Sequence, residues 1–342
     1  MSSTDGTVYT VYKNAGKYYI GGQFNYVGLM TGTSALTTAN NDYPDMDFPA
    51  FNSSARCAVP DGSGGWYVGG TFSAYDGNST NYLVHVLSNK TIDPSFNVSP
   101  NSYVYALYKK GTTLYLGGSF TSVNSTGRNY IAAVNSNTGV LLSFNPSASS
   151  AVYALFADAN NVYAGGQFTT IGGKYKPYFA VLDKTNGNAI NGYATVNSTV
   201  YTIQAKGDTV LLGGSFTQTG LQTSYLSSLT QTNDIPDAGF PTANGVVRCV
   251  IPDGNNGWYV GGAFTQIGGV NKSYLAHILS SKAVDASFTA DCNGEVKSIV
   301  KIGSKIYFGG SFTSVNGTTR NYAAAVNNSG VVQNWNPNTN ST

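Results

Sequence analysis

Histidine is the side chain best suited to acid–base chemistry near neutral pH, and this chain has two, His85 and His277. They lie 192 residues apart, at matching places in two similar segments. A metal site or a nucleophile–base pair built from them would need the two rings close together. Matching places in a repeating chain fall on different structural units, so we expect the histidines to lie apart. We interpret each as a histidine whose hydrogen bonds are satisfied within a strand.

Carboxylates are the second candidates, because glycoside hydrolysis needs a pair of positioned acids. Glu295 is the sole glutamate among 16 acidic residues, and the only dense acidic cluster is Asp42, Asp45 and Asp47. Such oxygen ligands suit Ca²⁺, but the spacing lacks the pattern of a calcium-binding loop. We favour a solvated turn and predict no metal and no cofactor. A glycan-acting hydrolase is the weakest alternative, and it would depend on Glu295 or Asp45.

Nucleophilic side chains lack the neighbours that would activate them. Serine and threonine abound, but the sequence has no GxSxG elbow and no phosphate-binding GxxxxGK[ST] loop. Cys57, Cys249 and Cys292 show no CxxC spacing, and the first two also lie 192 residues apart. We interpret them as free thiols and predict that the chain is not an enzyme.

These scarce residues are carried by a tandem repeat. The phrase Leu114–Phe120, LYLGGSF, recurs with a constant interval of 48 residues, and seven units account for nearly all of the 342 residues. A glycine pair in a strand permits close approach of another backbone, and the following phenylalanine would fill the core between sheets. We therefore interpret the repeated glycines and phenylalanines as packing residues. They are Gly21, Gly22, Phe24, Gly69, Gly70, Phe72, Gly117, Gly118, Phe120, Gly165, Gly166, Phe168, Gly213, Gly214, Phe216, Gly261, Gly262, Phe264, Gly309, Gly310 and Phe312.

Each unit has the composition of four short strands separated by turns, and none shows a helical period. In the third unit the expected strands are Val104–Tyr108, Leu114–Phe120, Tyr130–Val134 and Val140–Phe144. Four antiparallel strands repeated seven times predict an all-β, seven-bladed β-propeller, whereas a solenoid would favour shorter repeats and capping ends. We expect a single domain over 1–342, closed as a ring without strand exchange. The blades are expected at about 7–54, 55–102, 103–150, 151–198, 199–246, 247–294 and 295–342.

The double glycine at the end of a strand resembles that of kelch-type propellers. The phrase Gly309–Val326, GGSFTSVNGTTRNYAAAV, is more similar to the delta-sixty type GGxF repeats of bacterial and phage surface proteins. Similar repeats occur in fungal cortical polarity proteins. The Arg-Asn-Tyr steps at 128–130 and 320–322 belong to the same resemblance. It implies a propeller fold and an interaction or surface role, with no catalytic residues, because the family's motif is structural.

A longer period of 192 residues lies above the first. Units two and six, three and seven, and one and five match one another, while unit four has no partner. Duplication of a four-unit block, excision from a longer array and deliberate engineering would each produce this pattern. The longer period also explains why most of the rare residues occur in pairs.

The charge pattern excludes several partner classes. The formal net charge is +2 without a run of lysine or arginine, which gives no basis for binding nucleic acid or an acidic membrane. No apolar stretch is long enough for a membrane span, so no membrane insertion is expected, and the start MSSTDGT shows no signal peptide. Charged residues make up only 10%, against roughly 25% in typical domains. This favours, weakly, an extracellular or virion surface location.

What remains is binding through surface loops. The segments after each GGxF phrase differ most between units, and variable loops on a rigid scaffold are where recognition resides. Tyr26, Tyr75 and Tyr175 are the candidate exposed aromatic residues, while Arg56 and Arg248 replace a valine of the other units and could line a central channel or pair locally. The sequence thus favours a monomeric, non-catalytic interaction or structural module that binds a protein or glycan at its loop rim. A carbohydrate-binding propeller and an engineered scaffold without a natural ligand are the alternatives.

Overall fold

The computed structural model describes residues 6–14, 17–23, 26–27, 30–31, 34–38, 51–75, 77–190, 195–206, 209–219, 225–230, 237 and 239–336. These residues form strands, turns and bends without any helix, which confirms the predicted all-β fold for this part of the chain. With no helix among them, they also contain none that could cross a membrane. The abundance of β-branched and aromatic residues explains the preference for strands.

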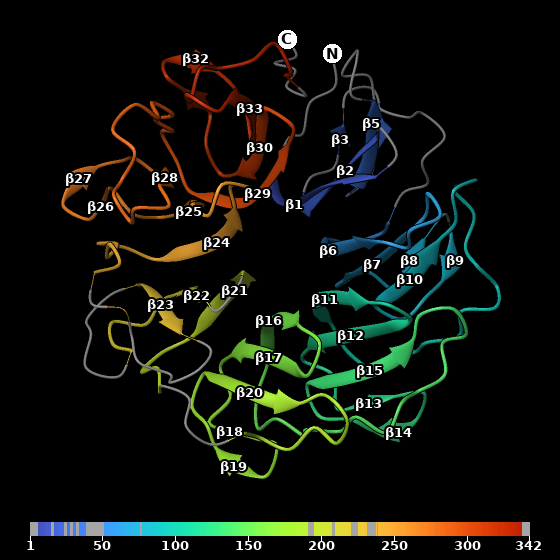
Figure 1. Ribbon diagram of the computed structural model, residues 1–342. Helices are drawn as coiled ribbons and strands as arrows, with labels where there is room; N and C mark the ends of the chain where they lie inside the picture. Colours follow the sequence, from blue (N-terminus) through green and yellow to red (C-terminus); the bar gives the residue numbers. More distant parts are fainter. Residues whose placement is uncertain are drawn as a thin grey trace.

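The described residues form seven antiparallel three-stranded sheets, each with the double-glycine strand in the middle (Figure 1). The sheets are β1 (Thr7–Asn14), β2 (Lys17–Gln23) and β5 (Ser34–Thr38); β6 (Ala55–Pro60), β7 (Trp66–Gly70) and β10 (Leu83–Val86); β11 (Val104–Lys110), β12 (Thr113–Gly118) and β15 (Ile131–Asn135); β16 (Val152–Ala157), β17 (Asn161–Gly166) and β20 (Phe179–Asp183); β21 (Val200–Lys206), β22 (Thr209–Gly214) and β23 (Leu226–Thr230); β24 (Val247–Pro252), β25 (Trp258–Gly262) and β28 (Leu275–Ile278); and β29 (Val296–Ile302), β30 (Lys305–Gly310) and β33 (Ala323–Asn327).

The polar loop that follows the GGxF phrase folds as a small hairpin in six units of the described chain. In the third unit Asn124 and Ser125 occupy the two central positions, both with positive φ, as a type I′ turn requires. The hairpins pair β3 (Tyr26–Val27) with β4 (Met30–Thr31), β8 (Ala74–Tyr75) with β9 (Asn78–Ser79), β13 (Ser122–Val123) with β14 (Thr126–Gly127), β18 (Thr170–Ile171) with β19 (Lys174–Tyr175), β26 (Gln266–Ile267) with β27 (Val270–Asn271), and β31 (Ser314–Val315) with β32 (Thr318–Thr319).

The expected fourth strand is present only as an isolated bridge. In the third unit Val134 pairs with Leu141, and the ladder stops there. The carbonyl of Leu142 accepts a hydrogen bond from the Arg128 guanidinium at 3.0 Å, and Phe144 turns inward against Tyr115. The Arg128 side chain thus bonds a carbonyl that a longer strand would have used in its ladder. Four strands per blade therefore stay a prediction.

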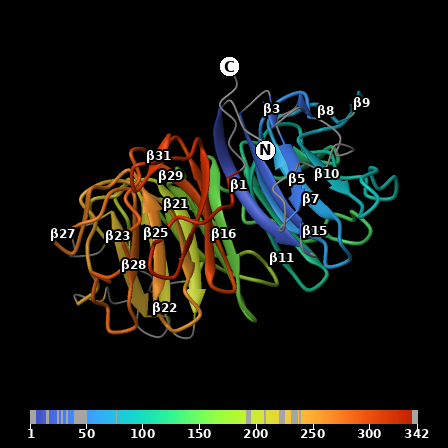
Figure 2. The same ribbon diagram turned by 90° about the horizontal axis from the view of Figure 1, so that it is seen from above.

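The first strands of neighbouring sheets contact one another in chain order, and β29 of the last sheet contacts β1. Figures 1 and 2 both place β1 between the sheet that contains β29 and the sheet that contains β7. Thr7 and Val8 pair with Gln23 and Gly22 of β2, so this segment belongs to the first sheet. The first strands lie around the centre of the arrangement in Figure 1.

The double glycine is required by contacts on both sides. A Cβ on Gly117 would lie 2.8 Å from the Val152 side chain of the next sheet, and one on Gly118 would collide with the Tyr103 carbonyl oxygen. Gly309 faces Val8 in the same way, so the last and first sheets pack as other neighbours do. The phenylalanines after the glycines are fully buried between sheets, except that Phe24 lies outside the described residues. They are Phe72, Phe120, Phe168, Phe216, Phe264 and Phe312.

Candidate functional site

Each first strand carries a β-bulge opposite the double glycine. In β11, Val104 pairs with Gly118 and Ala106 with Gly117, which leaves Tyr105 between them without a partner in the ladder. A bulge bends the strand and re-aims the extra side chain, and bulges are common next to functional sites. The register shift recurs in all seven first strands. The bulged residues are Tyr9, Arg56, Tyr105, Tyr153, Tyr201, Arg248 and Lys297.

These seven side chains, which we call the bulge ring, line one cavity of about 520 Å³. Every sheet contributes one residue to it. The volume is within the range of small-molecule sites, which is roughly 300–1,000 Å³. Because the bulge recurs in every sheet, it directs seven side chains to one cavity at the centre of the molecule.

One side of the bulge ring is aromatic. The ring centroids of Tyr105 and Tyr153 lie 5.3 Å apart, and those of Tyr153 and Tyr201 lie 5.9 Å apart. The Tyr153 hydroxyl donates to the Gln167 side-chain oxygen at 3.0 Å. Burial raises the pKa of Tyr153, with a smaller contribution from the neighbouring Tyr105 and Tyr201. Tyr153 therefore stays protonated at physiological pH, and the arc of three tyrosines, which we call the neutral arc, offers ring faces and hydroxyls.

The other side is charged. The Arg248 Nε donates to Glu295 at 2.7 Å, and the Lys297 Nζ lies 3.7 Å from the second oxygen of the same carboxylate. Burial lowers the pKa of Arg248, but the hydrogen bond and charge of Glu295 outweigh it, so that pKa lies above its ordinary value. Burial lowers the pKa of Lys297, and the two arginines reinforce this against the pull of Glu295. The Glu295 carboxylate thus interacts with both Arg248 and Lys297.

Arg56 completes the charged side and has no acidic partner among the described residues. Its guanidinium carbon lies 4.1 Å from the centroid of the Tyr9 ring, in cation–π geometry. Its Nε is buried without a hydrogen-bond partner. The cations of the ring outnumber Glu295 three to one, so the cavity carries excess positive charge.

The structure corrects the sequence alignment of the two arginines. By the constant 48-residue spacing, Arg56 and Arg248 correspond to a valine in the other units, and that valine pairs with the second glycine of the GGxF phrase. In the structure, however, the residues that pair with this glycine are Ala55 and Val247. The hairpin that follows is one residue longer in these sheets, because the Asp61 carboxylate accepts hydrogen bonds from the amides of Ser63 and Gly65 and holds a wider turn. The extra residue moves each arginine into the bulge.

The three predicted surface tyrosines have different outcomes. Tyr75 is only 1% exposed, and its hydroxyl donates to the Lys90 carbonyl, so the prediction that it lies exposed on the rim is wrong. It is buried because the β8–β9 hairpin folds back and packs its ring against Phe51, with the ring centroids 4.8 Å apart and the planes tilted by 48°. Tyr175 is 72% exposed in β19. The side chain of Tyr26 lies outside the described residues, as do the predicted calcium candidates Asp42, Asp45 and Asp47.

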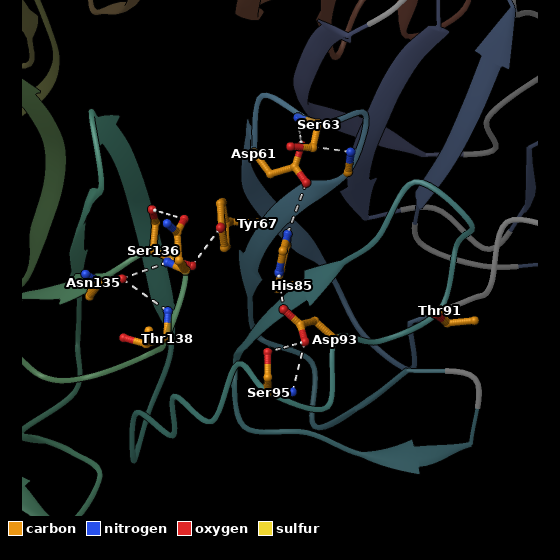
Figure 3. A network of polar contacts seen from close by, with 12 residues as sticks. Asp61, Ser63, Tyr67, His85, Thr91, Asp93, Ser95, Asn135, Ser136 and Thr138 are labelled. Carbon is orange, nitrogen blue, oxygen red and sulfur yellow. Dashed lines mark hydrogen bonds and ion pairs between the residues drawn. The ribbon is translucent and has the colours of Figure 1, made fainter.

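Both histidines lie in closed polar clusters. In the His85 cluster, Nδ1 lies 2.8 Å from Asp93 and Nε2 lies 3.3 Å from Asp61, as Figure 3 shows. The imidazole stacks on Tyr67 at 4.3 Å, and the Tyr67 hydroxyl donates to the Ser136 carbonyl of the next sheet. His85 is 7% exposed. With a carboxylate at each nitrogen, the ring has no free atom to accept a proton from a substrate.

The His277 cluster repeats this arrangement. Its nitrogens lie 2.8 Å from Asp285 and 3.2 Å from Asp253. Burial acts to raise the pKa of Asp285, but hydrogen bonds from Ser287 and His277 outweigh it, and that pKa lies below its ordinary value. The pKa of Asp93 is lowered in the same way by Ser95 and His85. These carboxylates are held in the charged form.

The remaining reactive groups form no site within the described residues. Cys57, Cys249 and Cys292 are free, and burial raises the pKa of each thiol. No group of three or more metal-ligating side chains occurs in this part of the chain. The bulge ring is therefore the candidate site that the described geometry supports.

The sequence profile of a β-propeller domain of unknown function (DUF5122) matches residues 60–96. This segment contains the double glycine of β7 together with His85 and Asp93. No curated protein sequence matched the chain. The profile match supports a β-propeller and covers a small part of the sequence.

Solved structures support the same fold. The chain is similar to the computationally designed protein Ika8, at 12% identity and a TM-score of 0.58, over 90% of this chain and 95% of that one. It is similar to the WD40 β-propeller domain of Doa1, at 10% identity and a TM-score of 0.64, over 90% and 91%. The extracellular domain of the hybrid two-component system BT4673 from B. thetaiotaomicron matches at 14% identity and a TM-score of 0.58, over 91% of this chain and 38% of that one. The fold is a β-propeller.

Proposed function

We propose that this chain is a closed seven-bladed propeller that acts as a non-catalytic binding module and takes an anion-bearing ligand in the bulge ring. Support for closure comes from the contacts of β29 with β1 and of Gly309 with Val8. The GGxF phrase would then be the structural repeat of the blade. The observation that carries the binding proposal is the convergence of seven bulged side chains on one cavity with excess positive charge.

Non-catalytic binding is favoured over hydrolysis because the described acids and bases are engaged with one another. Glu295 is shared by Arg248 and Lys297, and both histidines are enclosed by carboxylates. An arginine fork is well suited to hold a carboxylate or phosphate oxygen pair. A retaining or inverting glycosidase would instead need two carboxyl groups facing each other across a substrate, which the bulge ring does not provide within the described chain.

Isothermal titration calorimetry tests the proposal with inorganic phosphate, citrate and trigalacturonate as anionic probes and maltotriose as a neutral one. We expect at least one anionic probe to bind, with an affinity that falls as salt is added. The double variant Arg56→Met/Arg248→Met should weaken that binding by about tenfold or more, since each arginine would supply a charged hydrogen bond. Tyr175→Ala is the matched control, because Tyr175 lies outside the ring and is exposed. Equal binding by wild type and the double variant, or no anionic binding at all, would contradict the proposal.

A further inference from the structure

We infer, on the premise of the proposed function, that the ligand of the bulge ring is a carboxylate-bearing oligosaccharide. The ring is divided into two arcs of different chemistry. Tyr105, Tyr153 and Tyr201 form the neutral arc, and the cations with Glu295 form the charged arc. A ligand that fills both arcs needs a face that packs on aromatic rings and an anionic group beside it.

The charged arc fits a singly charged carboxylate better than a more highly charged group. Arg56 lines the cavity and has no acidic neighbour among the described residues. Arg248 and Lys297 already share the negative charge of Glu295. A dianion placed between these cations would also be repelled by Glu295, whereas a single carboxylate directed to Arg56 would give this guanidinium the acidic partner that it lacks among the described residues.

The neutral arc fits sugar rings. Its three tyrosines are tilted by 39° and 44° from one another, so their faces form a curved surface instead of a flat slot. Tyrosine offers a large apolar face together with a hydroxyl at its tip, which matches the mixture of C–H faces and hydroxyls on a pyranose. A planar aromatic ligand would stack on one of these rings but not follow the curve.

The aromatic surface extends beyond the cavity, which indicates an oligomer. The Tyr103 ring lies 6.2 Å from Tyr105, and the Tyr82 ring lies 5.4 Å from Tyr103. Tyr103 is 41% exposed. The five tyrosines from Tyr201 to Tyr82 thus form a continuous path that leads from the charged arc outward. A chain of sugars could stack along this path while one carboxylate reaches Arg56 or Arg248.

A single-stranded nucleic acid also combines stacking with negative charge. It needs a positive surface along its whole backbone, and such binding is strongly dependent on clustered lysine and arginine. Arg248 lies 4.4 Å from the Tyr201 ring at one end of the path, and the rest of the path has no cation–π contact among the described residues. The formal net charge of the chain is only +2. We therefore favour the acidic oligosaccharide and use an oligonucleotide as a competing probe.

The test compares trigalacturonate with maltotriose, which has the same length without carboxylates, with inorganic phosphate, and with hexathymidylate. Calorimetry should give an affinity for trigalacturonate at least about tenfold higher than for each of the other three. Tyr153→Ala should weaken trigalacturonate binding by about tenfold because it removes a ring on which the sugar packs, whereas Tyr175→Ala, which lies outside the ring, should bind trigalacturonate like the wild type. Arg56→Met should bring trigalacturonate close to maltotriose. Thermal unfolding of each variant confirms that the fold is retained.

The outcomes separate this inference from the proposed function. If trigalacturonate binds no more tightly than phosphate, or hexathymidylate binds more tightly than either, the inference is wrong. The proposed function would still stand in both cases, provided that Arg56→Met/Arg248→Met weakens the binding of the anion concerned. The inference is supported directly if Arg56→Met loses the preference for trigalacturonate and Tyr153→Ala binds trigalacturonate more weakly than Tyr175→Ala does.

Discussion

The bulge ring and the His85 cluster are both polar, but they differ in where their hydrogen-bonding groups are directed. In the His85 cluster the polar groups have partners within the sheet. Asp61 accepts a hydrogen bond from a backbone amide of its turn, and Asp93 accepts one from the Ser95 hydroxyl. His85 lies between the two carboxylates. In the bulge ring, Arg56 lines a cavity and has no acidic partner among the described residues. The first arrangement stabilises a sheet, and the second is open to a ligand.

The two regions are linked by the register of one hairpin. Asp61 lies at one end of the β6–β7 hairpin and holds the wider turn, and the residue that this turn adds places Arg56 in the bulge at the other end. The sheet with β24 and β25 repeats both features, with Asp253 and Arg248. A stabilising cluster and a binding residue therefore arise from the same local extension, which is why they occur in the same two units.

The largest effect on stability is expected from His85→Ala. The change leaves the buried carboxylates of Asp61 and Asp93 without the imidazole that lies between them, and removing one partner of a buried polar arrangement costs about 3–5 kcal/mol. Alanine itself fits, because Ala133 has the equivalent place opposite Tyr115 in the next sheet. Urea unfolding measures the loss.

The matching variant His277→Ala should lose a similar amount, since its cluster has the same distances. Adding Asp61→Asn and Asp93→Asn to His85→Ala should recover part of the loss, because the uncompensated charges are removed. A loss below about 1 kcal/mol in both single variants would mean that the clusters are not the closed, stabilising regions described above.

Gly117→Ala should have the second largest effect, because it alters the strand that faces the bulge. The new methyl would press on Val152, and overpacking of this kind costs about 1–3 kcal/mol. Gly127→Ala is the matched control, since no atom lies within 4 Å of the Cβ position there. Thermal unfolding of the two variants should differ by several degrees. An equal melting temperature would show that the sheets tolerate more space than the contacts indicate.

Acidification should weaken the closed clusters selectively. The pKa values of Asp93, Asp253 and Asp285 lie below their ordinary value, so their contribution to stability is complete above the unfolded pKa of about 4 and is lost as the pH falls towards the lowered folded values. The free energy of unfolding should therefore decrease below about pH 5. Asp93→Asn/Asp285→Asn should show a shallower decrease over this range. The same slope in variant and wild type would exclude these carboxylates as its source.

Changes in the bulge ring should have the smallest effect on stability. Arg56→Met removes a cation–π contact with Tyr9 worth about 0.5–1 kcal/mol and keeps the apolar stem. We expect a loss of less than about 1 kcal/mol in urea unfolding, together with the loss of anion binding. If Arg56→Met destabilises the chain as much as His85→Ala does, the ring is a structural element and not an open site.

Much of the fold could be predicted from the sequence, because its determinants are local and repeated. The 48-residue spacing of the glycine pair places the central strand of each sheet, and alternating apolar residues place its neighbours. The reduction of the fourth strand to a single bridge at Val134–Leu141 could not be predicted, since spacing does not reveal contacts such as that of Arg128 with the carbonyl of Leu142. That contact joins groups in different loops.

The candidate site was predicted only in part. Arg56 and Arg248 stand out in the sequence, but the constant spacing equates them with a valine, because the one-residue extension of the hairpin is compensated by a preceding segment that is one residue shorter. Tyr105, Tyr153 and Tyr201 follow a valine in every case, and this Val-Tyr step was the available signal. The burial of Tyr75 depends on how its hairpin folds back on Phe51, which spacing does not reveal.

The central claim is that the bulge ring is an open binding site while the His85 and His277 clusters are closed. It is tested most directly by titrating trigalacturonate into the wild type, Arg56→Met/Arg248→Met and His85→Ala/His277→Ala at a temperature where urea unfolding shows all three to be folded. We expect the arginine variant to lose about tenfold or more in affinity and the histidine variant to bind like the wild type. Wild-type affinity in the arginine variant, whether or not the histidine variant loses binding, would contradict it.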